Sequence, residues 1–430
     1  MRDKKTPVLL LTGYLGSGKT TLLNRILNNR KGIKFAVIVN DIGEVNIDAD
    51  LIAKGGVVKG SDDSLVALQN GCICCTLATD LMQQLSDLMA GEFDYIVIEA
   101  SGICEPEPIA RTICSMPFAA PDLVKNGTPV LDAIVTVVDA LRLKSEFDNG
   151  DTLTSKEHDE EDIENLVIQQ IEFCNIILLN KRSEVTPHEL GQIKDVIRAL
   201  QPKAEILECD YCNVDLDKLL HSSRFDYEKT ITSATWIQEI EKPLSEIEKE
   251  EENLLHEDHH GHSEEEHHHE HHEHDVHHHH AHDHEEDHEG HHGHGHHHHH
   301  HHGEGETEEY GISTFVYYRR KPFDINKFDW FVGKEFPKEI IRTKGICYFS
   351  DQKDMSYLFE QAGVQMKLTE AGKWYATAPQ EELEKLLAKE PGLMNDWDPE
   401  YGDRMQKLVF IGKGMNAEKI ISLLDSCLEK

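Results

Sequence analysis

The sequence has no apolar run that approaches the roughly 18 residues of a membrane-spanning helix. The apolar run near its start, residues 8–11, is also far shorter than the apolar core of about 7–15 residues in a secretory signal peptide. We therefore expect a cytoplasmic protein without a membrane partner. In that compartment its ten cysteines would be buried apolar residues, metal ligands or redox groups rather than a disulfide framework.

Positive charge is scarce, because 43 Lys and Arg face 80 Asp and Glu, for a formal net charge of -37. The imbalance is uneven. Residues 250–309 hold twenty acidic residues and no Lys or Arg, which leaves about -17 for the rest of the chain. A surface of this sign repels phosphate backbones, so we expect no nucleic-acid partner.

Residues 250–309 also have few apolar side chains and consist almost wholly of His, Glu, Asp and Gly, with 27 of the 30 histidines between His256 and His302. So little apolar surface cannot offset the conformational entropy lost on folding, and the composition predicts a disordered linker. Neutral imidazoles suit zinc, nickel, copper and cobalt, which favours a weak, multivalent metal-binding segment. A plain solvated acidic linker is the alternative.

Before this segment, short apolar runs alternate with helical spacing of apolar residues. The runs show little polar alternation, which predicts strands buried on both faces; they are residues 7–13, 34–41, 95–100, 133–140 and 175–181. Helical spacing occurs between them, at residues 18–30, 80–91, 161–174 and 187–202. Strand then helix, repeated, predicts an α/β domain with a largely parallel sheet flanked by helices.

Composition divides the chain into three parts: an α/β domain at residues 1–225, a connecting segment at 226–309 that contains the linker, and a smaller α+β domain at 310–430. In the last part, strands are expected within 311–323 and 345–351 and a closing helix over 417–430. Large aromatic residues bury area wherever they can, so a core position is expected for each tryptophan of this part: Trp330, Trp374 and Trp397.

The sequence GYLGSGKT, from Gly13 to Thr20, fits the phosphate-loop pattern G-x-x-x-x-G-K-[ST] between a predicted strand and a predicted helix. In such a loop, glycines let backbone N–H groups surround a phosphate, Lys19 reaches the outer phosphates and the Thr20 hydroxyl ligates magnesium. The pattern predicts a nucleoside-triphosphate site that includes the following residues: Gly13, Gly16, Ser17, Gly18, Lys19, Thr20 and Thr21.

Later strands supply candidate partners for this loop. Glu99 ends a predicted strand and Gly102 follows, as expected for a carboxylate near magnesium and an amide near the γ-phosphate. We assign Lys19 and Glu99 as the catalytic residues. Asn180 and Lys181 begin a guanine-reading N-K-x-D pattern, but the last position is Ser183. A serine accepts too few hydrogen bonds for this role, so Glu184 would have to replace the aspartate.

Three cysteines, Cys72, Cys74 and Cys75, lie within four residues. Such near neighbours cannot form good disulfides, but their soft thiolates can converge on one metal ion. The motif predicts an open three-sulfur site, with a fourth ligand from water, a carboxylate or a partner; redox-active or inert cysteines are the alternatives. A distant C-x-x-C pair, Cys209 and Cys212, is more often incidental than ligating.

These motifs, in order, resemble the CobW-type GTPases, a group of metal chaperones and metallocentre-assembly proteins. The resemblance rests on GYLGSGKTTLLN, NDIGEVNID, NGCICCTL, EASGICEP and NK, and on YRRKPFD, IRTKGICYFS, GKWYA and GDRMQKLVFIG after the linker. It implies a P-loop GTPase domain that binds GTP and magnesium, with zinc, cobalt or nickel at the three cysteines, and a second domain of the same family. Asp41 and Ser183 depart from the family pattern, in which Glu and Asp are common.

The expected function is a GTPase that delivers metal to a client metalloprotein, with a homodimer left open. The segments Asn40–Asp48 and after Glu99 are placed to act as nucleotide switches, with Asp41 and Glu44 as secondary metal-ligand candidates. Zinc is the first choice of cargo. Cobalt for cobalamin synthesis, insertion of nickel, iron or cobalt into one enzyme, a passive histidine-rich metal store and an unrelated P-loop kinase are the alternatives.

Overall fold

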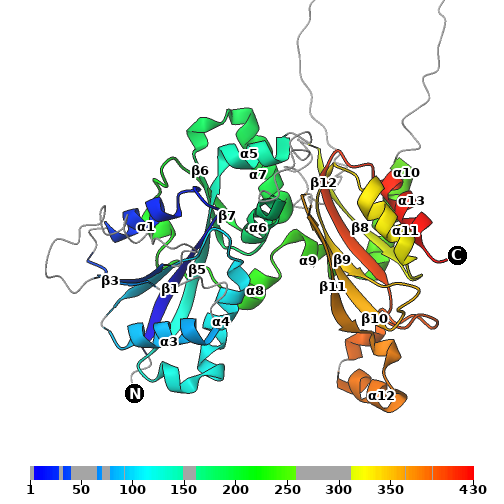
Figure 1. The fold of residues 1–430 in the computed structure, drawn as a ribbon, viewed down its shortest axis with the longest axis horizontal. Helices are drawn as coiled ribbons and strands as arrows, with labels where there is room; N and C mark the ends of the chain where they lie inside the picture. Colours follow the sequence, from blue (N-terminus) through cyan, green and yellow to red (C-terminus); the bar gives the residue numbers. More distant parts are fainter. Residues whose placement is uncertain are drawn as a thin grey trace, which may run out of the picture.

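A computed structural model of the chain describes residues 4–28, 32–39, 65–69, 78–91, 93–148, 161–257, 311–363, 365–389 and 391–430. These residues form two domains, one built on a seven-stranded sheet and the other on a five-stranded sheet. Figure 1 shows the two domains side by side. The Asn40–Asp48 segment with Asp41 and Glu44, the three cysteines Cys72, Cys74 and Cys75, and the histidine-rich residues 258–310 lie outside the described residues.

The first sheet is parallel throughout, with strand order β3-β2-β4-β1-β5-β6-β7. Its strands are β1 (Lys5–Thr12), β2 (Phe35–Val39), β3 (Leu65–Gln69), β4 (Tyr95–Glu99), β5 (Thr128–Asp139), β6 (Ile176–Asn180) and β7 (Glu205–Glu208). The five predicted strands are present. β3 and β7 were not predicted, because LVALQ and EILE are short and interrupted by polar residues.

Helices cover both faces of this sheet. Leu9 and Leu11 of β1 pack with α1 on one face, whereas Val8 and Leu10 face the helices of the other. The helices are α1 (Lys19–Leu27), α3 (Ala78–Met89), α4 (Pro106–Ala119), α5 (Ala140–Asp148), α6 (Glu161–Glu172), α7 (Pro187–Leu200) and α8 (Tyr227–Ile231), with 3-10 turns η1 (Pro121–Val124), η3 (Arg182–Glu184) and η4 (Leu216–Lys218). This is the predicted α/β fold.

The second domain has an antiparallel sheet of order β11-β10-β9-β12-β8. Its strands are β8 (Ile312–Arg319), β9 (Ile340–Cys347), β10 (Met355–Ala362), β11 (Gln365–Lys373) and β12 (Gln406–Lys413). Its helices are α11 (Ile325–Trp330), α12 (Gln380–Lys389) and α13 (Ala417–Cys427), with shorter turns η7 (Phe331–Glu335), η8 (Tyr375–Thr377) and η9 (Pro391–Met394). The predicted α+β class is confirmed.

Aromatic residues fill one face of this second sheet, where Phe323 and Phe328 stack with ring centroids 4.9 Å apart. The expectation that the tryptophans are core residues holds for Trp374, which is 7% exposed, but is wrong for Trp330, which is 53% exposed. Trp330 ends α11 on a side that no described element covers, whereas Phe328 and Phe331 take the buried positions of that segment. Trp397 is half-buried.

Two helices precede the histidine-rich segment and pack on the second sheet: α9 (Thr235–Ile240) contacts β9 and β12, and α10 (Leu244–Glu257) contacts β8 and α13. Lys242 forms an ion pair with Glu250, and Arg319 of β8 forms one with Glu251. Residues 250–257, predicted from composition as the start of the linker, are helical as the last part of α10. No helix of the described ranges has the length and apolarity needed to cross a membrane.

Candidate functional site

The loop between β1 and α1 contains three glycines with positive φ angles, 132° at Gly13, 75° at Gly16 and 116° at Gly18. A Cβ atom on Gly13 would lie 2.3 Å from the carbonyl oxygen of Val137, so the close approach requires glycine. Backbone N–H groups at the start of α1 lack intrahelical partners, and with the helix dipole they favour a bound anion. The local conformation thus suits a phosphate group.

Two side chains of the same loop also suit an anionic ligand. Lys19 is only 8% exposed, and its Nζ donates to the Tyr14 carbonyl oxygen over 3.2 Å, which holds a cation beside the loop. The Ser17 hydroxyl is buried without a hydrogen-bond partner in the part of the chain that the structure describes. Because an unpaired buried hydroxyl costs free energy, a phosphate oxygen at this loop would stabilise it. Thr21 is exposed on α1 and contributes no comparable contact.

Glu99 lies beside the phosphate loop, because β4 and β1 are neighbouring strands. It is the last residue of β4, is 1% exposed and pairs with Leu11 of β1, next to the loop. The Thr20 hydroxyl donates to Glu99 Oε1 over 3.0 Å. A hydroxyl and a carboxylate side by side are oxygen ligands of the kind that magnesium takes in nucleotide sites. The pair fits the predicted magnesium shell.

The segment after Glu99 lies against the same loop. A Cβ atom on Gly102 would lie 2.7 Å from the backbone nitrogen of Leu15, so this approach also requires glycine. Gln170 of α6 holds the segment, because its Nε2 donates to the carbonyl oxygens of Gly102 and Cys104, each over 3.1 Å. Gln170 is 1% exposed and was missed from the sequence, since one polar residue in a helical pattern gives no sign of what it contacts.

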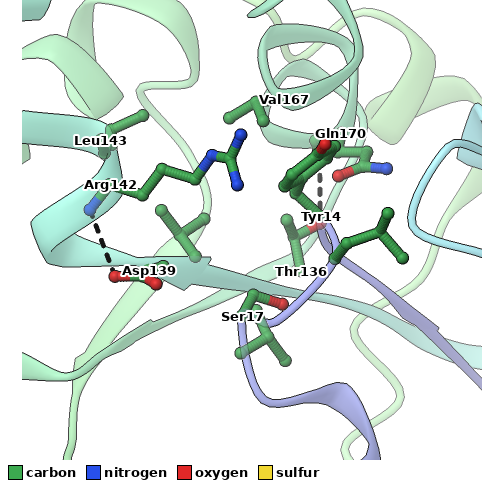
Figure 2. A pocket seen from close by; sticks show the side chains of 11 residues that line it. Tyr14, Ser17, Thr136, Asp139, Arg142, Leu143, Val167 and Gln170 are labelled. Carbon is green, nitrogen blue, oxygen red and sulfur yellow. Dashed lines mark hydrogen bonds between the residues drawn. The ribbon is translucent and has the colours of Figure 1, made fainter. Parts of the chain in front are cut away.

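Figure 2 shows a small pocket beside the phosphate loop, where β5 and α6 meet. Thr136 of β5 donates its hydroxyl to the Gln170 carbonyl oxygen over 2.8 Å, which fixes α6 to the centre of the sheet. The Arg142 guanidinium lies 4.1 Å from the centroid of the Tyr14 ring. Asp139 accepts a hydrogen bond from the Arg142 backbone N–H over 3.2 Å. The pocket therefore combines apolar walls with charged groups beside the loop.

Asn180, the last residue of β6, joins the phosphate loop to two other segments. Its Nδ2 donates to the Ser17 carbonyl oxygen over 2.8 Å, and its Oδ1 accepts from the Cys212 backbone N–H over 3.0 Å. Lys181 has a left-handed backbone, with φ 58°, and its ammonium pairs with Asp139 at the end of β5. Asn180 and Lys181, predicted to contact the base, and the phosphate loop thus lie together at the carboxyl ends of the parallel strands.

Ser183 donates twice to a carboxylate of the neighbouring loop. Its backbone N–H and its hydroxyl both reach Asp210 Oδ1, over 2.9 Å and 2.8 Å. These bonds lower the pKa of Asp210, which stays ionised at neutral pH. Glu184, predicted to replace the missing aspartate, has an exposed side chain, and Asp210 is the carboxylate that contacts Ser183.

The C-x-x-C pair lies in the same loop and is fully enclosed. Cys209 and Cys212 are 6% and 0% exposed, and the Cys212 sulfur lies 3.4 Å from the Gly18 carbonyl oxygen. They pack against the phosphate loop instead of forming part of a ligand cluster. Within the described ranges, no three His, Cys, Asp or Glu residues are grouped so that they could hold a metal ion.

Comparisons with known proteins agree with this geometry. Residues 7–208 match the model of the CobW/HypB/UreG nucleotide-binding domain, and residues 312–428 match that of the cobalamin synthesis protein cobW C-terminal domain. The chain is 33% identical over 442 residues to zinc-regulated GTPase metalloprotein activator 1 of Dictyostelium discoideum, across 99% of this chain and 80% of that protein. It is 32% identical over 203 residues to zinc chaperone CobW of a Sinorhizobium species, across 45% of this chain and 55% of that protein.

Among solved structures, the zinc-bound YjiA GTPase from Escherichia coli aligns over 99% of this chain and 100% of that chain, with 19% identity and a TM-score of 0.38. That likeness is too remote to inform individual residues. The two domain matches, and the Dictyostelium relative that aligns over 99% of this chain, show the family. The chain belongs to the CobW family of P-loop GTPases.

Proposed function

We propose that the protein is a GTP-hydrolysing metallochaperone, which binds zinc or a related divalent metal at Cys72, Cys74 and Cys75 and delivers it to a client metalloprotein. The names of the relatives, a zinc-regulated metalloprotein activator and a zinc chaperone, support zinc as the cargo. Cobalt and nickel share the same ligands, so the metals must be compared directly.

The observation that carries the proposal is the register of three neighbouring strands. Val39, the last residue of β2, pairs with Gln69 of β3 on one side and with Glu99 of β4 on the other. β3 therefore ends at the same level as Glu99, two strands away, at the carboxyl ends of the parallel strands. Cys72 follows Gln69 by three residues, a reach of at most about 10 Å. This short separation in the chain supports a metal motif close enough to the nucleotide site to be coupled to it.

GTP hydrolysis would proceed by positioning and charge stabilisation. Lys19 would neutralise the outer phosphates, Thr20 and Glu99 would hold magnesium, and Gly102 would offer its amide to the γ-phosphate. Magnesium, when bound, offsets the negative charge that develops on the phosphates. Gln170 donates to the Gly102 carbonyl oxygen and thereby restricts the movement of this segment.

Loss of the γ-phosphate removes a hydrogen-bond partner of the Gly102 segment. In the proposed mechanism, this change is transmitted along the carboxyl ends of β4, β2 and β3 to the cysteine motif. Coupling between two sites is reciprocal. If nucleotide state alters zinc affinity, zinc must alter GTP affinity by the same factor, and hydrolysis can time the release of metal to the client.

The test is GTP turnover and GTP affinity of the full chain with and without one equivalent of zinc, with ATP as the control nucleotide. A Cys72/Cys74/Cys75→Ser variant should lose the zinc effect, whereas Cys114→Ser, on the helix α4, should retain it. A variant without residues 258–302 should keep one tight zinc site. The proposal is wrong if zinc leaves both quantities unchanged, and a passive store is favoured if the deletion removes the tight site as well.

A further inference from the structure

Ser183 stands where the N-K-x-D pattern needs an aspartate, and Asp210 contacts it from the next loop. We propose that Asp210 is the residue that recognises the guanine base, with Ser183 as the residue that positions it. The inference rests on the nucleotide site of the proposed function and is independent of the metal.

Guanine presents two N–H donors on one edge, at N1 and at the 2-amino group. A carboxylate can accept both, because it has two oxygens and no proton to donate. The Ser183 hydroxyl already donates its proton to Asp210 Oδ1, over 2.8 Å, and has a single oxygen. Ser183 therefore cannot supply the pair of acceptors that guanine requires.

Asp210 has the acceptor capacity that Ser183 lacks, because two lone pairs of Oδ2 are available for the two guanine donors. Both hydrogen bonds from Ser183 end on Oδ1, over 2.9 Å and 2.8 Å, and no other described group donates to Oδ2. The Ser183 N–H and hydroxyl stabilise the charged carboxylate, as does the positive charge of Arg182. The result is an ionised carboxylate, held by one oxygen, next to the position where the pattern expects an aspartate.

The loop that carries Asp210 is fixed to the rest of the nucleotide site. The Arg182 N–H donates to the Cys209 carbonyl oxygen over 3.1 Å, so the loops after β6 and β7 run together. Arg25 of α1 donates to the Tyr211 carbonyl oxygen over 2.7 Å and to Asn213 Oδ1 over 2.9 Å. Since α1 begins at the phosphate loop, Asp210 keeps a constant distance from the phosphates. A base-reading group requires this, because the base and the phosphates belong to one ligand.

In chemical terms, the carboxylate that the pattern lacks at Ser183 is supplied by Asp210 from the adjacent loop, 2.8 Å from the serine hydroxyl. If Asp210 only closed a turn, its loop would not need to be held to α1. The contact also explains why the pattern looks broken in the sequence, because residues 183 and 210 meet only after β6 and β7 have paired.

The test is Asp210→Asn in the full chain, with equilibrium binding of GDP and of xanthosine diphosphate measured by calorimetry in magnesium and without zinc. Xanthine carries a carbonyl oxygen where guanine carries the 2-amino group, so an asparagine amide can donate to xanthine. Loss of two charge-assisted hydrogen bonds predicts at least about a hundredfold weaker GDP binding. Xanthosine diphosphate should then bind more tightly than GDP, which reverses the preference of the wild type.

Asparagine keeps an Oδ1 acceptor for Ser183, so the loop should stay folded, and a gain of xanthine binding cannot result from misfolding. Glu184→Gln is the matched control, since it neutralises the neighbouring exposed carboxylate and should change neither affinity. The exchange variant Ser183→Asp with Asp210→Ser should recover GDP binding to within about tenfold of wild type.

Retention of the GDP preference by Asp210→Asn, or its loss in Glu184→Gln, would overturn the assignment and leave the metallochaperone proposal intact. A wild-type chain that binds neither nucleotide would overturn both. These outcomes are distinguishable because the wild type is measured with both nucleotides.

Discussion

Arg342 and Glu172 form a buried ion pair that joins the two domains, and its removal should strongly destabilise the protein. Arg342 of β9 is 1% exposed and Glu172 of α6 is 7% exposed. The guanidinium donates to both carboxylate oxygens, over 2.9 Å and 3.1 Å, and to the Gln361 carbonyl oxygen over 3.3 Å. Arg342→Met would leave the Glu172 carboxylate buried without its partner, at a cost of about 3–5 kcal/mol.

The magnitude can be measured by urea unfolding of the full chain, followed by circular dichroism. The double variant Arg342→Met, Glu172→Leu removes both charges and should recover most of the loss, because no uncompensated charge remains. Lys353→Met is the matched surface control: its partner Glu429 lies 2.8 Å away, both side chains are over 40% exposed, and the expected loss is below about 1 kcal/mol. A loss below about 1 kcal/mol for Arg342→Met, or a double variant as unstable as the single one, would refute the reasoning.

Three further predictions concern single residues. Glu99→Gln keeps the shape of the side chain but removes its charge beside Thr20, so GTP turnover measured by phosphate release should fall about a hundredfold; unchanged turnover would exclude Glu99 from catalysis. Gly102→Ala places a Cβ 2.7 Å from the Leu15 nitrogen, which forces the two segments apart, so turnover should fall about tenfold and the unfolding midpoint should also decrease; unchanged turnover would show that this close approach is not needed for hydrolysis. Hydrogen bonds from the Lys144 side chain and the Thr186 backbone lower the pKa of Glu189 from 4.5 to about 2. Because the pKa of Glu189 is lower in the folded protein than in the unfolded chain, this stabilisation is present above pH 4.5 and is lost as the pH falls toward 2. Glu189→Gln should therefore reduce the pH dependence of the free energy of unfolding over that range.

The phosphate loop and the central strands were predictable because their signals are local. The positive φ angles of Gly13, Gly16 and Gly18 follow from the residue type, and an uninterrupted apolar run such as FAVIV predicts a strand buried on both faces. β3 and β7, at the two edges of the sheet, are short and partly polar, so pairing with a neighbour decides them more than their own sequence does.

The rest of the site depends on contacts between residues far apart in the chain. Gln170 reaches Gly102 across 68 positions, and Arg342 reaches Glu172 across 170. The Ser183–Asp210 contact spans 27 positions and requires two strands to pair first. No periodicity or spacing rule encodes such pairs, and the sequence alone therefore offered Glu184, the nearest carboxylate in the chain, and gave no sign of the contact between Ser183 and Asp210.

The position of α9 and α10 has a practical consequence for dividing the protein into fragments. Both helices precede the histidine-rich segment in the chain, yet they pack on the sheet that follows it, and Leu254 of α10 touches the aromatic core of the second domain. A fragment that begins at residue 310 would lose these helices and expose the apolar surface that they cover. The smallest fragment expected to remain soluble begins before Thr235, and a protease that cuts only between α10 and β8 should leave two chains that co-purify.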